Sequence, residues 1–128
     1  MKFLLVLLFI PLLTIPAFAE SQTLSTDKGT LDVKLSYDDI KTGELTRLPI
    51  EFINPMTQKT QVHIDYKITV IKDGQNIFGP IPLTHTSVGT VKIPVEFTSN
   101  GEYQVKIEME GILFQPIPLE TTYFTINV

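Results

Sequence analysis

Two imidazoles and a carboxylate are the side chains of this sequence best suited to binding chemistry. The chain has two histidines, His63 and His85, and Asp65 follows the first of them by two residues. Residues i and i+2 of a β-strand point to the same side, about 7 Å apart, so His63 and Asp65 are expected on one outer face. Imidazole nitrogen and carboxylate oxygen are ligands for Zn²⁺ and Cu²⁺. If His85 lies beside that strand, the three residues form a candidate copper or zinc site.

The same residues also have a simpler interpretation as polar surface groups. His63 and Asp65 fit a solvated sheet face, and His85 lies between two threonines that a loop imidazole can contact. No H-x-H or H-x-x-x-H pair groups the imidazoles as closely as most metal sites do. The distance between the two rings discriminates the interpretations. Beyond roughly 8 Å, one ion cannot reach both rings at bond lengths of about 2 Å.

A second set of candidate binding residues lies in two stiff, apolar segments, residues 78–83 and 112–119. Each contains Phe followed closely by Pro-Ile-Pro-Leu. Proline-stiffened apolar loops lose little entropy on binding and therefore suit recognition of another protein. Such segments equally suit a role as lids over the ends of a core. Exposure of both segments at the same end of the domain would favour recognition. The candidate partner-binding residues are Phe78, Pro80, Pro82, Phe114, Pro116 and Pro118.

The sequence offers little for catalysis. It has no cysteine, which excludes thiol chemistry, disulfides and Cys-based metal sites. Ser87 lies near His85, but there is no Gly-x-Ser-x-Gly motif and no spacing that demands a triad. A calcium site at Asp38, Asp39 and Glu44 competes with the simpler interpretation of a solvated acidic surface. We therefore expect a protein that is not an enzyme and that needs no cofactor beyond the candidate metal.

The first 19 residues have the three parts of a secretory signal peptide. Lys2 precedes an uncharged apolar stretch, which ends in Ala-Phe-Ala at residues 17–19. A retained membrane anchor is the alternative, but this stretch is at the short limit for a span and contains Pro11 and Pro16. The sequence therefore predicts cleavage after Ala19 and a secreted or cell-surface protein without a membrane span.

Loss of this segment leaves a more acidic chain. Residues 1–19 carry Lys2 and no acidic residue, so the net charge of −4 becomes −5. Nucleic acids and anionic membrane surfaces both require basic patches, so neither is an expected partner. We expect a protein or a cell-surface component instead, and the sequence leaves the oligomeric state open.

The remaining residues alternate between apolar and polar types in short runs with turn residues between them. This is the pattern of half-buried strands, and about seven runs occur, with Asp73-Gly74 predicting a type I′ hairpin turn. We therefore predict an N-terminal extension over 20–29 and one all-β, two-sheet sandwich over 30–128. The predicted inward residues are Leu31, Val33, Leu35, Tyr37, Leu48, Ile50, Phe52, Val62, Ile64, Tyr66, Ile68, Val70, Val91, Ile93, Val95, Phe97, Tyr103, Val105, Ile107, Met109, Phe124, Ile126 and Val128.

Two prolines do not fit a regular sheet. Pro49 and Pro94 fall inside two of the runs, although proline cannot donate to a strand ladder and belongs at edges or bulges. We expect these two runs to be interior neighbours in one sheet. Either a bulge accommodates each proline or the strand order differs.

The segment 100–105, Asn-Gly-Glu-Tyr-Gln-Val, resembles the start of strand F in immunoglobulin-like domains. There the tyrosine hydroxyl returns to the backbone as a tyrosine corner, which predicts this contact for Tyr103. Val105 stands where antibody domains carry a cysteine. The tryptophan usual on strand C is missing, and Tyr66 is expected to replace it in the core.

The whole chain after residue 19 looks like the small exported immunoglobulin-like domains of archaeal cell surfaces. This resemblance implies a fibronectin III-like sandwich and an extracytoplasmic binding or scaffolding module, with no catalytic residues to transfer. The first functional hypothesis is a non-enzymatic module that binds through its stiff loops and one outer sheet face. The alternative is an extracytoplasmic copper- or zinc-binding protein. The segments that carry the resemblance are residues 63–66, 78–80, 84–86, 100–103 and 114–118.

Overall fold

Nine β-strands make up the part of the protein that the computed structural model describes, residues 20–128. The predicted signal peptide lies outside the described residues. Within residues 20–128 there is no helix that could cross a membrane. The strands are β1 (Glu20–Ser25), β2 (Asp32–Tyr37), β3 (Leu45–Ile53), β4 (Ile64–Lys72), β5 (Gln75–Phe78), β6 (Thr84–Thr86), β7 (Thr90–Glu96), β8 (Glu102–Ile112) and β9 (Gln115–Asn127).

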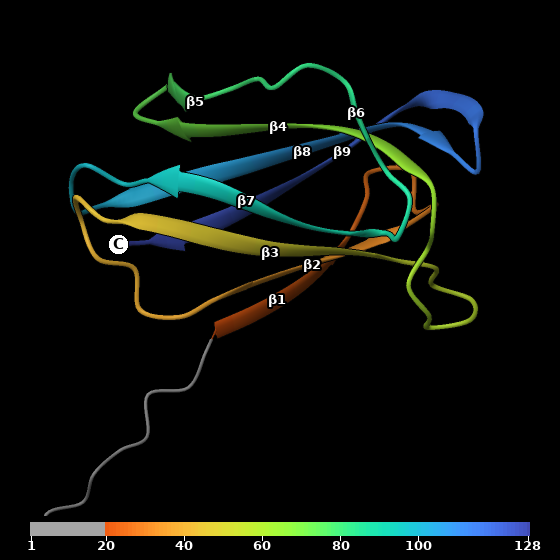
Figure 1. Ribbon diagram of the computed structural model, residues 1–128, viewed down its shortest axis with the longest axis horizontal. Coiled ribbons are helices and arrows are strands. Elements are labelled where there is room, and N and C mark those ends of the chain that lie inside the picture. The colour runs from red at the N-terminus through yellow and green to blue at the C-terminus, as the bar shows by residue number, and fades with distance from the viewer. Residues whose placement is uncertain (1–19) are drawn as a thin grey trace, which may run out of the picture.

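The strands form two antiparallel sheets that pack face to face (Figure 1). One sheet has the order β1-β2-β3-β7, and the other has the order β5-β4-β8-β9 with β6 also paired to β4. The predicted all-β, two-sheet sandwich is therefore confirmed. Two strands exceed the expected seven: β1 lies in the segment 20–29, and β6 lies in a stretch without alternation.

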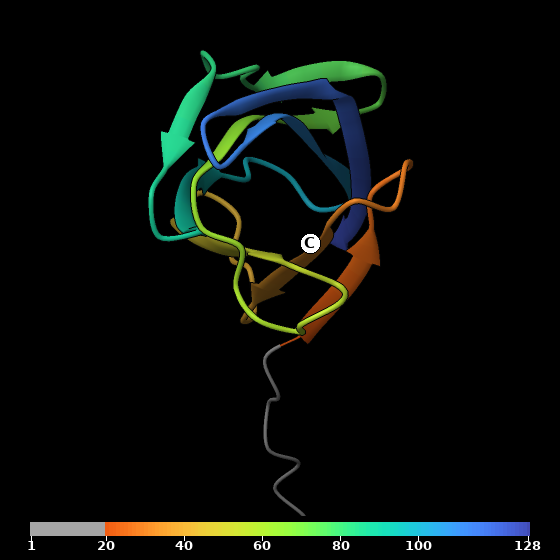
Figure 2. The same ribbon diagram turned by 90° about the vertical axis from the view of Figure 1, so that its right-hand side faces the viewer.

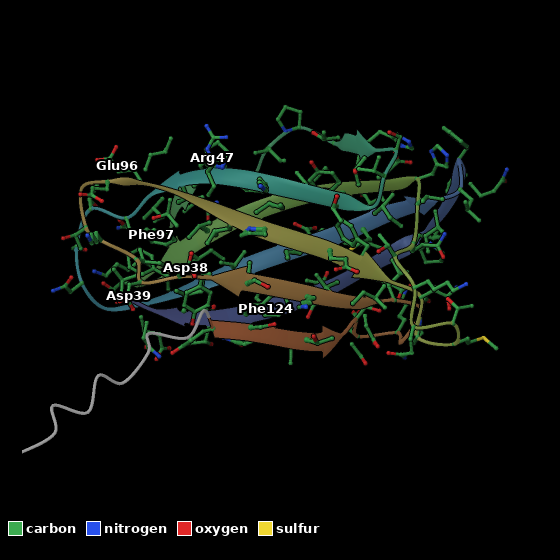
Figure 3. All side chains as sticks on the ribbon, turned by 60° about the horizontal axis from the view of Figure 1, so that its bottom comes forward. Asp38, Asp39, Arg47, Glu96, Phe97 and Phe124 are labelled. Atoms are coloured by element: carbon green, nitrogen blue, oxygen red, sulfur yellow. The ribbon has the colours of Figure 1, made fainter. Side chains whose placement is uncertain are left out.

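The inward side chains of the two sheets form a single core, in which Phe97 and Phe124 lie (Figure 3). Each of the 20 buried apolar side chains belongs to the predicted inward set. Burial of such side chains, at roughly 1.5–3 kcal/mol each, is what offsets the entropy of ordering the chain. The prediction was wrong for Val62, which is 41% exposed because β4 begins only at Ile64.

Two buried tyrosines occupy the places expected from the sequence. The Tyr103 hydroxyl donates a hydrogen bond to the Ser99 carbonyl at 2.7 Å, which confirms the predicted return to the backbone. The Tyr103 ring also meets Phe97 edge-on. Tyr66 packs against Phe52, with ring centroids 5.7 Å apart, and burial raises the pKa of Tyr66.

The strand order explains both prolines. β7 is an edge strand of its sheet, so Pro94 can lie in it without leaving an inner neighbour short of a donor. Pro49 lies in β3 next to Ile50, where the pairing with β2 ends at Leu35↔Ile50. The two strands are neighbours as expected, but β7 is an edge strand and β3 has no β2 partner at Pro49, so the position of the strands in the sheet accommodates both prolines. The strand that precedes β7 in the chain, β6, does not pair with β7; it pairs with β4 in the opposite sheet.

Two hairpins turn through residues with positive φ at both central positions. Asp73 and Gly74 join β4 to β5 with φ values of 51° and 74°, as the type I′ prediction requires. Leu113 and Phe114 join β8 to β9 with φ values of 51° and 64°. The second turn has the same backbone geometry but side chains poorly suited to it, and it lies at the end of the sandwich that carries both histidines.

Candidate metal site

β6 and the β8–β9 hairpin turn lie at the end of the sandwich that faces the viewer in Figure 2. Both imidazoles of the chain lie side by side at this end. The ring centroids of His63 and His85 are 5.3 Å apart, well within the limit of roughly 8 Å for sharing one ion. Nδ1 of His63 lies 3.1 Å from Nε2 of His85. The two rings therefore direct one nitrogen each toward the same point.

Asp65 lies behind His85 rather than beside the shared point. Its Oδ1 is 2.7 Å from Nδ1 of His85, on the far side of the ring from the nitrogen that faces His63. A carboxylate in this position keeps the proton on Nδ1 and leaves the Nε2 lone pair free. The sequence hypothesis took Asp65 as a third ligand, but the geometry gives it an orienting role.

Sheet pairing brings Asp65 and His85 together. β6 pairs with the start of β4, and the two residues are direct cross-strand partners. Cross-strand partners in a sheet have Cβ atoms about 4.5–5.5 Å apart, which is the distance that an imidazole–carboxylate contact needs. The irregular stretch that ends in β6 thus places His85 beside β4, as the site hypothesis required.

A left-handed backbone conformation turns His63 toward His85. It lies just before β4 with a φ of 56°, so it is not the strand residue that the alternation predicts. Its N–H donates to the Ser87 carbonyl at 3.4 Å, and its carbonyl accepts from the Leu113 N–H at 2.8 Å. These bonds hold His63 between the chain after β6 and the turn after β8.

Phe114 forms an aromatic wall over both imidazoles. Its ring centroid lies 4.3 Å from that of His63 and 5.1 Å from that of His85. The sequence analysis placed Phe114 among the partner-binding candidates and missed this contact. The signal that could have found it is the Leu-Phe pair in a hairpin turn, where Asn-Gly or Asp-Gly is expected.

Backbone strain is concentrated at this end. Among the described residues, five other than glycine have positive φ, and His63, Leu113 and Phe114 are three of them. A left-handed conformation costs a side-chain-bearing residue roughly 1–2 kcal/mol. Such strain persists where the surrounding structure enforces it, and it clusters at functional sites.

Gly111 makes room for the orienting carboxylate. It is buried in β8 as the direct partner of Asp65 across the sheet. A Cβ atom at this position would overlap Oδ2 of Asp65 and crowd the rest of its side chain. The absence of a side chain at residue 111 therefore allows Asp65 to hold its place behind His85.

The imidazole pair can hold either a proton or a metal ion between its two nitrogens. With neutral rings, one N–H···N hydrogen bond fits the 3.1 Å separation. At metal–nitrogen bonds of about 2.0–2.1 Å the same separation gives an N–metal–N angle of about 100°, between the square-planar and tetrahedral values. An ion bonded to both nitrogens would lie to one side of the line that joins them, so each ring would turn toward the ion as it replaces the proton.

One chain alone supplies two ligands to this point. Among residues 20–128, no three His, Cys, Asp or Glu side chains are grouped so that they could hold one ion together. This includes the acidic residues Asp38 and Asp39, which lie at the other end of the sandwich (Figure 3). An ion at the histidine pair would therefore keep open positions for water or for further ligands.

The candidate partner-binding residues do not form one surface. The segment 79–83 runs along the outer edge of β4, where the Ile81 N–H donates to the Ile68 carbonyl, and Phe78 packs partly into the core. Pro116 and Pro118, expected in a link, lie in strand β9, two strands away from that edge. Phe114, at the tip of the β8–β9 hairpin, lies against His85, which follows the first segment in the chain.

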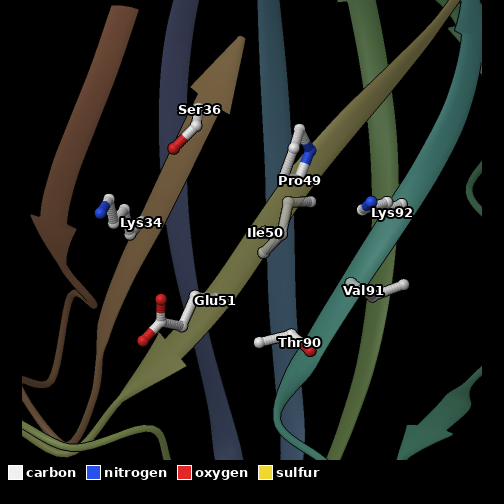
Figure 4. A pocket seen from close by; sticks show the side chains of 8 residues that line it. All are labelled: Lys34, Ser36, Pro49, Ile50, Glu51, Thr90, Val91 and Lys92. Carbon is white, nitrogen blue, oxygen red and sulfur yellow. The ribbon is translucent and has the colours of Figure 1, made fainter. Parts of the chain in front are cut away.

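A hollow in the described surface lies in the other sheet, away from the histidines. It has a volume of about 440 Å³ and lies over β2, β3 and β7 beside Pro49 (Figure 4). Lys34, Glu51 and Lys92 are its charged lining residues. Glu51 already accepts a hydrogen bond from Thr60. No nucleophile–base pair converges here, so the hollow adds no second candidate for catalysis.

Comparison of this chain with known protein families, with curated proteins and with solved structures finds no match. The site must therefore be interpreted from its own geometry.

Proposed function

We propose that this protein is an exported metal-binding protein that holds one Zn²⁺ or copper ion between Nδ1 of His63 and Nε2 of His85. The observation that carries this proposal is the 3.1 Å separation of the two nitrogens, which is short enough for one ion to bond to both. Imidazole is a ligand for both metals, and no softer sulfur ligand from cysteine exists in the chain.

The surroundings of the pair support an ion site. A metal-ligating histidine usually donates its second N–H to a carboxylate, and Asp65 accepts this bond from His85. Phe114 shields one side of both rings. An ion would replace the proton between the two nitrogens: His63 would take the tautomer with its proton on Nε2, by exchange with solvent, so that Nδ1 binds the ion and the neutral ring releases no net proton.

The alternative is that the three residues serve only to fasten β6 to β4. Asp65 and His85 would then be a structural pair, and His63 would complete a surface network. Both functions predict that His85→Ala weakens the fold, so stability alone does not distinguish them. Metal affinity does.

The test is calorimetric titration of residues 20–128, which contain every strand and the whole core, with Zn²⁺ and with Cu²⁺. We expect saturable heat, and we expect His63→Ala and His85→Ala each to weaken binding by at least about 100-fold, because one ligand cannot chelate. Lys92→Ala, in the other sheet, is the matched surface control. Absence of heat, or affinity unchanged in His63→Ala, would overturn the proposal.

The protein-binding hypothesis keeps one supporting observation. Phe114 is 67% exposed at the tip of a strained hairpin, beside the histidine pair. The immunoglobulin-like character and the export of the chain remain proposals that rest on the sequence resemblance and the leader pattern. The strand orders β2-β3-β7 and β4-β8-β9 support the former, because they follow the A-B-E and C-F-G orders of such sandwiches.

A further inference from the structure

The histidine end of the sandwich combines an incomplete ligand set with exposed apolar side chains. Four large apolar residues from the three segments around the pair are exposed: Val62 (41%), Val88 (62%), Leu113 (51%) and Phe114 (67%). Val62 precedes His63, and Val88 follows Ser87, whose carbonyl accepts the His63 N–H. Leu113 donates its N–H to His63. Exposed apolar side chains gathered around one point in this way mark a candidate contact site.

Apart from Asp65, which is hydrogen-bonded to His85, the segments around the pair carry no acidic side chain. Residues 60–63, 85–90 and 111–118 contain no Lys, Arg, Asp or Glu, although the whole chain has a net charge of −4. The opposite end carries Asp38, Asp39, Arg47 and Glu96 (Figure 3). Two copies of an acidic protein repel one another least where their facing surfaces are uncharged.

We infer that two copies of this chain share one metal ion, with His63 and His85 of each copy completing a site of four imidazoles. This inference rests on the proposed function and names the partner of the same site. A twofold axis through the ion relates the two histidine pairs, so two ligands per chain become four. Four ligands are what tetrahedral Zn²⁺ requires, and the angle of about 100° within each pair is close to the tetrahedral value.

The twofold arrangement also accounts for the apolar rim. In an isologous interface each surface patch meets its own copy, so Leu113 and Phe114 of one chain face the same end of the other. The ion lies at the centre of the interface between the two chains. The apolar side chains around it exclude water, as the apolar core of a protein interface does. The twofold axis is perpendicular to the line from the ion to the middle of each pair, and the rotation of each pair about that line sets the angle at which the two chelate planes cross.

The test measures mass and metal content of residues 20–128 together. Light scattering after size exclusion, without metal and with ZnCl₂, should show the monomer mass and then twice that mass, and chelation with EDTA should restore the monomer. Titration should end at about one Zn²⁺ per two chains. His63→Ala and His85→Ala should lose the doubling.

A second variant separates the interface from the ligands. Leu113→Asn keeps both imidazoles, Phe114 and the backbone N–H that binds the His63 carbonyl, and Asn tolerates positive φ, but the variant removes an exposed apolar side chain. We expect Zn²⁺ still to bind, with the association of the two chains weakened by at least about tenfold, because the interface loses the burial of a leucine side chain. Leu45→Ser is the matched control, because Leu45 is 63% exposed and begins β3 at the opposite end.

The outcomes separate this inference from the proposed function. One Zn²⁺ per chain with the monomer mass would overturn the shared site and leave the metal function standing. No Zn²⁺ binding at all would overturn both. A doubled mass that persists in EDTA or in His63→Ala would show an association that does not depend on the ion, and would equally overturn the inference.

Discussion

Asp65 and His85 are direct partners across β4 and β6, and the carboxylate Oδ1 lies 2.7 Å from Nδ1 of the imidazole. The contact fixes both the orientation of the ring and the nitrogen that carries its proton. It therefore decides which nitrogen of His85 faces His63. This relationship gives the site its direction: the carboxylate lies behind His85, and the proposed ion position lies between the two imidazoles.

Loss of the charge on Asp65 should weaken metal binding without removing a ligand. Asp65→Asn keeps a hydrogen-bond acceptor behind His85 but lowers the basicity of the ring, and outer partners of this kind contribute about 10–100-fold to metal affinity. We expect a loss in that range by Zn²⁺ titration, with Asp39→Asn at the other end as the control. Equal losses in the two variants would assign the effect to net charge.

A methyl group at residue 111 should displace the Asp65 carboxylate that orients His85. Gly111→Ala displaces the Asp65 carboxylate, so we expect weaker Zn²⁺ binding together with lower stability. In a background of Asp65→Ala the same methyl group meets less obstruction, so the two changes should not be additive. Chemical denaturation of the four chains measures this coupling. Additive losses would contradict the proposed overlap.

The β8–β9 turn should show a trade between stability and association. Replacing Leu113-Phe114 by Asn-Gly suits the type I′ geometry, as Asp73-Gly74 already does in the β4–β5 hairpin. Relief of the left-handed strain at two residues should raise the free energy of unfolding by about 1–3 kcal/mol. The same change should abolish zinc-dependent doubling of the mass. A destabilised variant would show that the apolar turn contributes more to packing than it loses to strain.

Alkaline conditions should loosen the attachment of β1. Burial raises the pKa of Tyr37, and its hydrogen bond to Glu20, at 2.6 Å, raises the pKa further. The folded state therefore holds the phenol proton more tightly than the unfolded chain does. The stability from this group is complete below about pH 10, the ordinary pKa of tyrosine, and falls as the pH rises through the higher folded value.

The comparison that isolates this effect is between the original chain and Tyr37→Phe. Denaturation at a series of pH values from 8 to 12 should show a stability difference of about 1 kcal/mol at the start, from the lost hydrogen bond. The difference should shrink above about pH 10. Parallel curves would show that Tyr37 does not titrate differently in the two states.

The sequence predicted the core better than the site, for physical reasons. Alternation identifies buried faces directly, and each of the 20 buried apolar residues follows from it. β1 and β6 escape this pattern because β1 is almost wholly polar and exposed and β6 has three residues. Their pairing depends on neighbours distant in the chain, which local periodicity does not record.

The three polar site residues were found from their chemistry, but their arrangement was not. The alternation extended β4 to Val62 and so placed His63 on a regular strand, whereas its left-handed φ turns it toward His85. The role of Asp65 depends on β6, and the place of Phe114 depends on a turn that its residue types disfavour. Such departures from local preference are expected at functional sites.

The position of His85 on the shortest strand has a consequence for the integrity of the whole sheet. β6, with three residues, covers the backbone of β4 from Ile64 to Tyr66, and without it this stretch would be an unpaired edge open to a strand of another molecule. An ion held by His63 and His85 would fasten that cover in place. Metal depletion would then raise the risk of edge-to-edge aggregation, because His85, which binds the ion, belongs to the strand that covers the edge of β4.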